Sequence, residues 1–198
     1  MSTLPSSNYA KVMDYPEDCE ELYVFDFTKG YDAHFIRSKE WGIGRYNEKR
    51  SGMYVAPHYH NLRNIHMGID IWTRAGAPVY SFADGKVAYM QDNDRDGDYG
   101  PTVVIKYHLD EGIRYALYGH LSRASLQMVS VGEQISSGQK IAQIGTEKVN
   151  GGWAPHLHFQ LAVKDPEQAD MPGVVAEEDH AQALKAYPDP RNVLGNIY

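Results

Sequence analysis

A histidine and an aspartate four positions apart, with a glycine between them, are the first residues of this chain that suggest chemistry. They lie in the segment Ile65–Trp72, whose β-branched residues favour a strand. Because alternate residues of a strand share a face, His66, Gly68 and Asp70 are expected on one side, with apolar residues on the other. Gly68 leaves space for an ion between the imidazole and the carboxylate. The segment therefore indicates a strand with one core face and one face able to bind a metal.

A second strand-like segment, His156–Val163, carries two histidines in the same alternating pattern. His156, His158 and Gln160 are expected on one face, and leucine and phenylalanine side chains on the other. Histidines on an otherwise apolar strand are costly to bury without partners. A metal ion or a polar groove would explain them.

A third segment, Tyr118–Ser122, lies at the end of a predicted strand and contains His120. In isolation His120 is best interpreted as a structural core histidine. The three segments together are more specific, because imidazole and carboxylate groups are suitable zinc ligands. A catalytic zinc uses three protein ligands and keeps one position for water.

The composition is that of an ordinary globular protein, with 198 residues, 42% hydrophobic and 23% charged. The net charge is -7, and no basic cluster indicates a nucleic-acid partner. Cys19 is the only cysteine, which excludes an intramolecular disulfide and a multi-cysteine zinc site. Its acidic neighbours would raise the pKa of the thiol, so Cys19 is not expected to be a nucleophile.

The first residues lack the basic and apolar regions of a secretory signal, and no apolar run is long enough to span a membrane. These two observations predict a cytoplasmic protein with no membrane partner.

The pattern along the chain predicts a mainly β, antiparallel sandwich or barrel-like core followed by a short C-terminal helix. We expect residues 1–63 to be an extension that packs on the core, with one strand near Leu22–Phe27. The core is expected over 64–164, and a C-terminal extension over 165–198 contains a helix at Glu177–Tyr187. The predicted core strands are Ile65–Trp72, Pro78–Phe82, Lys86–Asp92, Thr102–His108, Arg114–His120, Lys140–Ile144 and His156–Val163.

The three histidine-containing motifs resemble those of lysostaphin/LytM-type zinc endopeptidases, which cleave peptide cross-links of bacterial cell walls. The motifs are His66-Met-Gly-Ile-Asp70, Tyr118-Gly-His120-Leu-Ser122 and Pro155-His156-Leu-His158-Phe159. The intervening segments also match the family's spacing, so that the resemblance extends from about Asn64 to Ala162.

This resemblance implies a lysostaphin-type peptidase core with a duplicated hybrid motif and one zinc ion per chain. It implies that His66, Asp70 and His158 hold the zinc and that His120 and His156 are catalytic.

Three further segments are similar to a cytoplasmic branch of that family, in which the peptidase-like domain lies between a kinase-like and an aminotransferase domain. They are Gly44–Arg50, Met171–Val174 and Asp189–Gly195.

Three hypotheses about function follow. The first is a zinc metalloendopeptidase that uses a zinc-activated water on Gly- or D-Ala-containing peptidoglycan-type peptides, with a groove near Gly151–Trp153. The second is a zinc-bound binding or regulatory module that does not hydrolyse peptidoglycan. The third is a metal-free scaffold, in which His66, Asp70 and the two histidines of His156–His158 would need separate polar environments. The sequence does not indicate an oligomeric state.

Other polar motifs favour structural interpretations. The segment Asp92–Gly97 resembles half of a calcium-binding EF-hand loop, but Val103 stands where that loop needs a glutamate, so a solvated hairpin loop is expected. His58 and His60 are expected at the surface, with a role in the groove or at the metal as the alternative. Gly42-Ile-Gly44 is too short to indicate nucleotide binding.

Overall fold

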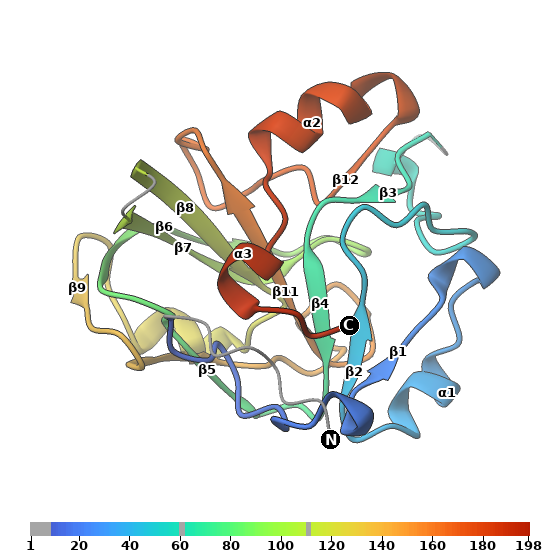
Figure 1. The fold of residues 1–198 in the computed structure, drawn as a ribbon, viewed down its shortest axis with the longest axis horizontal. Helices are drawn as coiled ribbons and strands as arrows, with labels where there is room; N and C mark the ends of the chain where they lie inside the picture. Colours follow the sequence, from blue (N-terminus) through green and yellow to red (C-terminus); the bar gives the residue numbers. More distant parts are fainter. Residues whose placement is uncertain (1–8, 60–61, 110–111) are drawn as a thin grey trace.

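An eight-stranded sheet forms the centre of the computed structural model, which describes residues 9–59, 62–109 and 112–198 (Figure 1). All its neighbouring strands are antiparallel except the pair β1 and β2. In spatial order its strands are β1 (Tyr23–Val24), β2 (Gly42–Gly44), β4 (Ile69–Trp72), β11 (His156–Ala162), β8 (Gly112–Gly119), β7 (Gly100–Leu109), β6 (Gly85–Asn93) and β9 (Gln134–Ile135).

Two small antiparallel ribbons complete the β structure. One pairs β5 (Pro78–Tyr80) with β10 (Lys140–Gln143), and the other pairs β3 (Ile65–His66) with β12 (Val174–Val175). Val79 and Ile141 of the first ribbon share one hydrophobic core with Ile71 and Phe159 of the large sheet. This second layer over the sheet confirms the prediction of a mainly β, sandwich-like fold.

The alternation that predicted β11 is present in the structure. Leu157, Phe159 and Leu161 lie in the main core. His156 and His158 alternate with these residues on the opposite face of the strand and line a cavity. Each predicted core strand has a counterpart within a few residues of its expected bounds.

The expected single strand over 65–72 is wrong in one respect, because the chain divides there into β3 and β4. Up to Met67, which donates its N–H to the carbonyl of Gly173 at 2.9 Å, the chain pairs with the segment of β12. From Ile69 onwards it pairs with β2 and β11 of the large sheet. Gly68 makes this change possible, because a Cβ there would lie 2.6 Å from the His158 ring. His66 and Asp70 still point to the same place, with His66 Nε2 3.3 Å from Asp70 Oδ1.

The N-terminal segment contributes more structure than its composition predicts. It supplies two strands instead of one, and β2 pairs with β4 so that Gly44 lies opposite Asp70. A Cβ at Gly42 would collide with the Phe25 ring, so glycine permits the close packing there. The boundaries at 63/64 and 164/165 stay predictions, since β2 and β12 both pair with strands between those boundaries.

The helices are short, and in Figure 1 α1 (Ala33–Arg37) and α2 (His180–Ala186) lie to the sides of the sheet, whereas α3 (Arg191–Leu194) lies over it and places Val193 and Leu194 in the main core. The predicted helix near Glu177–Tyr187 is present as a 3₁₀ turn that leads into α2. The helices α1 and α3 were not predicted. The 3₁₀ helices are Cys19–Glu21, Phe27–Lys29, Pro57–Tyr59, Arg123–Gln127 and Glu177–Asp179.

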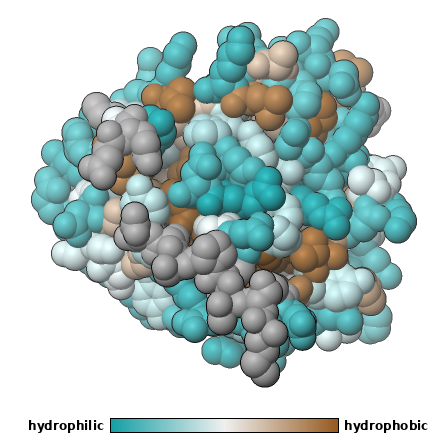
Figure 2. Space-filling model, in the orientation of Figure 1, coloured by the Kyte–Doolittle hydropathy of each residue, from teal (hydrophilic) through white to brown (hydrophobic). Residues whose placement is uncertain are grey.

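Within the described residues, the helices lack the length and apolar character that a bilayer span needs. Figure 2 shows that one face of the molecule is mostly hydrophilic, with apolar side chains in small separate patches.

Candidate active site

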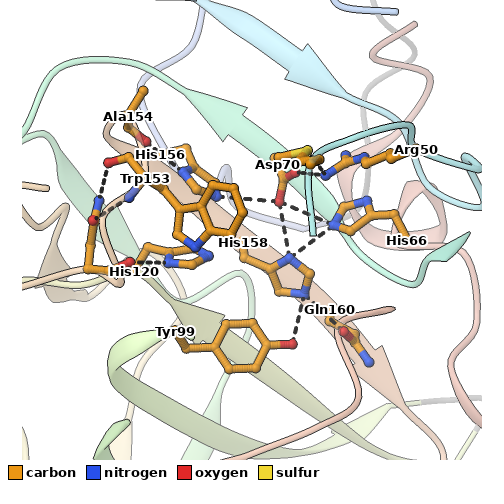
Figure 3. Close-up of polar contacts among 12 residues, drawn as sticks. Arg50, His66, Asp70, Tyr99, His120, Trp153, Ala154, His156, His158 and Gln160 are labelled. Atoms are coloured by element: carbon orange, nitrogen blue, oxygen red, sulfur yellow. Dashed lines mark hydrogen bonds and ion pairs between the residues drawn. The ribbon is translucent and has the colours of Figure 1, made fainter. Parts of the chain in front are cut away.

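The candidate site lies where β4, β11 and the end of β8 meet. Asp70 and His158 are register partners on β4 and β11, and His158 lies opposite Gly119 of β8. His120 follows Gly119, and β3 brings His66 alongside (Figure 3). The sheet order therefore gathers five polar side chains from three segments that are far apart in the chain.

Three ligand atoms form a small triangle in this site. Asp70 Oδ1 lies 3.0 Å from His158 Nδ1 and 3.3 Å from His66 Nε2, and the two imidazole nitrogens are 3.1 Å apart. A tetrahedral zinc with bonds of about 2.0–2.1 Å requires ligand atoms about 3.3 Å apart. The three side chains are buried and their spacing fits one divalent cation.

Hydrogen bonds on the far side of each ring fix where the ring protons are. His66 Nδ1 lies 2.8 Å from the carbonyl oxygen of Arg45, which can only accept, so Nδ1 carries the proton. His158 Nε2 lies 2.9 Å from Gln160 Oε1. The Gln160 amide N–H donates to the carbonyl of Pro172, so its oxygen faces His158.

The two nitrogens that face each other are therefore both unprotonated. His66 Nε2, His158 Nδ1 and Asp70 Oδ1 each direct a lone pair at one point, with no proton between them. Buried acceptors without a donor are costly, whereas a shared cation satisfies all three. The donor set of two imidazoles and a carboxylate suits zinc.

Two more imidazoles lie beside the triangle, and both leave Nε2 free. His156 Nδ1 is 2.8 Å from the carbonyl of Ala154, and His120 Nδ1 is 2.8 Å from the carbonyl of Asn150. Their ring centroids are 4.1 Å apart, and His156 Nε2 is 3.8 Å from Asp70 Oδ1. Trp72 stacks on His156 with ring centroids 3.8 Å apart, which fixes the ring plane.

His120 is held in an uncommon backbone conformation. Its φ of 61° lies in the left-handed region, which few residues other than glycine adopt. This conformation turns the chain at the end of β8 and accompanies the contact of the ring with the loop near Asn150.

Burial favours the neutral form of three imidazoles of the site. It lowers the pKa of His66 and of His156 to about 4, and it holds the pKa of His120 well below its usual range. Burial alone would raise the pKa of the Asp70 carboxyl, but the positive charge of the Arg50 guanidinium holds that pKa well below its usual range. At neutral pH the site therefore offers the Asp70 carboxylate beside the uncharged rings of His66, His120 and His156.

A cavity of about 580 Å³ opens beside these residues. All five predicted site residues line it, as does Trp153 from the expected Gly151–Trp153 edge. Tyr54, Tyr59 and Tyr99 add aromatic surface. The cavity is large enough for a short stretch of peptide.

Sequence reasoning missed two residues that contact the triangle. Arg50 donates to Asp70 Oδ2 at 2.7 Å, and the Tyr99 hydroxyl lies 3.5 Å from His158 Nε2. Neither stands in a regular alternating pattern with the other site residues, so the only signal for Arg50 is the similarity of its segment to the cytoplasmic branch.

The remaining polar motifs lie away from the triangle or outside the description. The segment Asp92–Gly97, considered above as half of an EF-hand loop, lies in the hairpin that joins β6 to β7. Its Asp92 and Asp94 pair with Arg123, which follows β8, at 3.0 and 2.8 Å. His60 lies outside the described residues, and the side chains of His58 and Cys19 are not part of the description.

The buried histidines predict a pH-dependent stability of the metal-free protein. Because the folded pKa of His66 and His156 is lowered to about 4, the unfolded chain binds more protons as the pH falls below about 6.5. The free energy of unfolding should then decrease by about 2–3 kcal/mol per histidine between about pH 7 and about pH 4.5. Urea unfolding at these two pH values measures the change.

The variant His156→Phe removes one of the titrating groups and should show a smaller decrease. His34→Gln changes an exposed histidine, serves as the control and should behave as the parent. Equal pH dependence of the parent and His156→Phe would contradict this account of His156.

Comparison with known proteins places these residues in a family. The family model described as Peptidase family M23 matches residues 64–171. The peptidoglycan DD-endopeptidase ShyB of Vibrio cholerae is 38% identical over 112 residues, which are 54% of this chain and 24% of that protein. The peptidoglycan DD-endopeptidase ShyA of the same organism is 36% identical over 100 residues, 50% of this chain and 20% of that protein.

Among solved structures, the catalytic domain of lysostaphin from Staphylococcus simulans aligns with a TM-score of 0.49 and 20% identity, covering 77% of this chain and 98% of that domain. The chain spans no more than about a quarter of the length of the two Vibrio relatives. The family match covers more than half of the chain and includes the triangle and both flanking histidines. The family expected from the motifs is confirmed, and the chain belongs to peptidase family M23.

Proposed function

We propose that this chain is a zinc-dependent metalloendopeptidase that hydrolyses a peptide bond in Gly- or D-Ala-containing peptidoglycan-type peptides. The observation that carries the proposal is the triangle of His66 Nε2, Asp70 Oδ1 and His158 Nδ1, all three buried and without a proton between them. Membership of the family supports the reaction class. Two relatives that are named as peptidoglycan DD-endopeptidases support the substrate class.

His66, Asp70 and His158 would hold the zinc. When bound, it would supply Lewis acidity and lower the pKa of a coordinated water from about 15.7 towards 7. The bound peptide would lie in the cavity, where Trp153 and Tyr99 can pack against it.

His120 and His156 perform the proton transfers in this proposal. Each keeps Nε2 free and directs Nδ1–H to a carbonyl, which fixes the tautomer that can accept a proton. One accepts the proton of the attacking water at Nε2. This proton passes to Nε2 of the other, which then donates it to the leaving amine or, while protonated, stabilises the oxyanion. Their rings are adjacent, so both assignments of the two roles remain in the proposal.

The other two hypotheses fare differently. A metal-free scaffold needs separate partners for His66, Asp70 and His158, whereas these groups contact one another. A zinc-bound module without hydrolytic activity differs from the proposed enzyme in turnover alone. A cytoplasmic location, the absence of a nucleic-acid partner and the three-part domain division stay predictions.

The first experiment measures zinc content and peptide cleavage in the same preparations. The parent should contain one zinc per chain and cleave cross-linked peptidoglycan peptides, and a chelator should abolish cleavage. His158→Ala should lose both the metal and the activity. His120→Ala and His156→Ala should keep the metal and lose about 10²- to 10⁴-fold in kcat, because each removes a proton-transfer group.

Cleavage that is absent in the parent although zinc is bound would favour the binding or regulatory module. A parent that holds no zinc would overturn the metal site.

The glycine inside the first motif offers a second test. In Gly68→Ala the added Cβ would lie 2.6 Å from His158 Cε1 and 2.9 Å from the carbonyl of Phe159, so the ring must move. Zinc affinity should fall at least about tenfold, as for other changes that misplace a ligand. Competition with a chromophoric chelator measures it.

Gly76→Ala is the matched control, because it strains a left-handed glycine with nothing within 4 Å of the added Cβ. It should lower stability and leave zinc affinity unchanged. Unaltered zinc affinity in Gly68→Ala would show that His158 is not a ligand.

A further inference from the structure

A buried guanidinium contacts the carboxylate of the triangle from outside the part of the chain that the family model matches. Arg50 is 2% exposed, and its Nη1 donates to Asp70 Oδ2 at 2.7 Å. The matched region begins at residue 64. The contact therefore comes from the N-terminal segment of this chain (Figure 3).

Several contacts hold this guanidinium in place. Nη1 also donates to the Tyr54 hydroxyl at 2.8 Å, and Nε donates to Glu48 Oε2 at 3.2 Å. The guanidinium carbon lies 4.8 Å from the centre of the Phe27 ring. Gly44 leaves the necessary space, since a Cβ there would lie 2.7 Å from Arg50 Nη2 and 3.0 Å from Asp70 Oδ2.

The backbone of the same segment is tied to the first ligand. Asn47 donates its N–H to the carbonyl of His66, and His66 donates its N–H to the carbonyl of Glu48, at 2.8 and 3.0 Å. The carbonyl of Arg45 accepts a hydrogen bond from His66 Nδ1. The stretch 45–50 therefore contacts two of the three triangle residues, through main chain and side chain.

Burying a guanidinium costs several kcal/mol unless charged partners offset the cost. Here Arg50 pairs with Glu48 and Asp70, and Arg45 also pairs with Glu48 at 3.5 Å, so two carboxylates balance two guanidiniums. The contact occupies Asp70 Oδ2 and leaves Oδ1 as the oxygen that faces His66 and His158.

The geometry points to Arg50 as a positioning residue of the metal centre, which holds the Asp70 carboxylate so that Oδ1 alone binds the ion. This inference rests on the proposed zinc site. The planar fork of arginine can reach Asp70, Tyr54 and Glu48 together, which the single ammonium of lysine cannot do. Charge alone is therefore insufficient, and the orientation of the guanidinium sets that of the carboxylate.

The decisive variant is Arg50→Lys, which keeps the charge and loses the fork. The dissociation constant for zinc, measured on the metal-stripped full chain by competition with a chromophoric chelator, should rise about 10- to 100-fold, as for other partners of metal ligands. The d–d absorption spectrum of the cobalt-loaded variant should also differ from that of the parent, because the carboxylate coordinates differently. At saturating zinc, KM for the peptide should stay at the parent value.

The control is Arg123→Lys, which makes the same change at an exposed arginine that also pairs with two carboxylates. It should bind zinc as the parent does. If Arg50→Lys fails to fold by circular dichroism, Tyr54→Phe replaces it, since the phenol oxygen is one of the acceptors that fix the guanidinium. Loss of that hydrogen bond should weaken zinc binding about threefold to fivefold.

Parent-like zinc affinity and cobalt spectrum in the folded variant would overturn the inference and leave the proposed function standing. A raised KM with unchanged zinc affinity would overturn it too, because Arg50 would then bind the substrate. A parent that binds no zinc would overturn the proposed function and this inference together.

Discussion

Three lone pairs that face one another between buried side chains are the constraint on which this site depends. The carbonyl of Arg45 and the amide oxygen of Gln160 accept hydrogen bonds from the far ring nitrogens of His66 and His158. Each ring proton therefore lies on the far nitrogen, and the two nitrogens that face each other carry none. Low dielectric makes such unmatched acceptors costly, and it makes a cation shared among them correspondingly favourable. The rest of the fold can be understood as what keeps these three atoms within 3.3 Å of one another.

The large sheet does this by register. Asp70 and His158 lie opposite each other on β4 and β11, so their separation is fixed by main-chain pairing. The aliphatic residues on the other face of β11 hold that strand in the main core. The ring orientations of the two flanking histidines are fixed by one loop, because the carbonyls of Asn150 and Ala154 accept hydrogen bonds from their Nδ1 atoms. This division lets the core set the positions of the three triangle atoms and lets a loop orient the rings of His120 and His156.

Both extensions of the chain contribute to this arrangement. The N-terminal segment supplies the carbonyl of Arg45 and the guanidinium of Arg50, and the C-terminal segment supplies β12 and the carbonyl of Pro172. The family model covers residues 64–171 and therefore includes neither contribution. The triangle lies within the matched region, whereas the contacts behind it extend into segments on both sides of that region.

The sequence predicted the parts that follow from alternation and missed those that depend on long-range contacts. His156 and His158 lie on a strand in which every second residue is apolar and faces the core, so it was predictable that the two histidines share the other face. The division of 65–72 at Gly68 was not, because it results from the approach of His158, which lies 90 residues away in the chain. Arg50 stands in a polar, irregular stretch, and only the buried carboxylates of Glu48 and Asp70 give it a role. Short strands such as β2, with two glycines in three residues, carry too little pattern to detect.

An anomalous-scattering map recorded at the zinc edge, on crystals grown with zinc, tests the central claim most directly. The account predicts one peak about 2.0–2.2 Å from His66 Nε2, Asp70 Oδ1 and His158 Nδ1, with a fourth position open towards His120 and His156. Absence of a peak at the triangle, or a zinc held by other side chains, would contradict it.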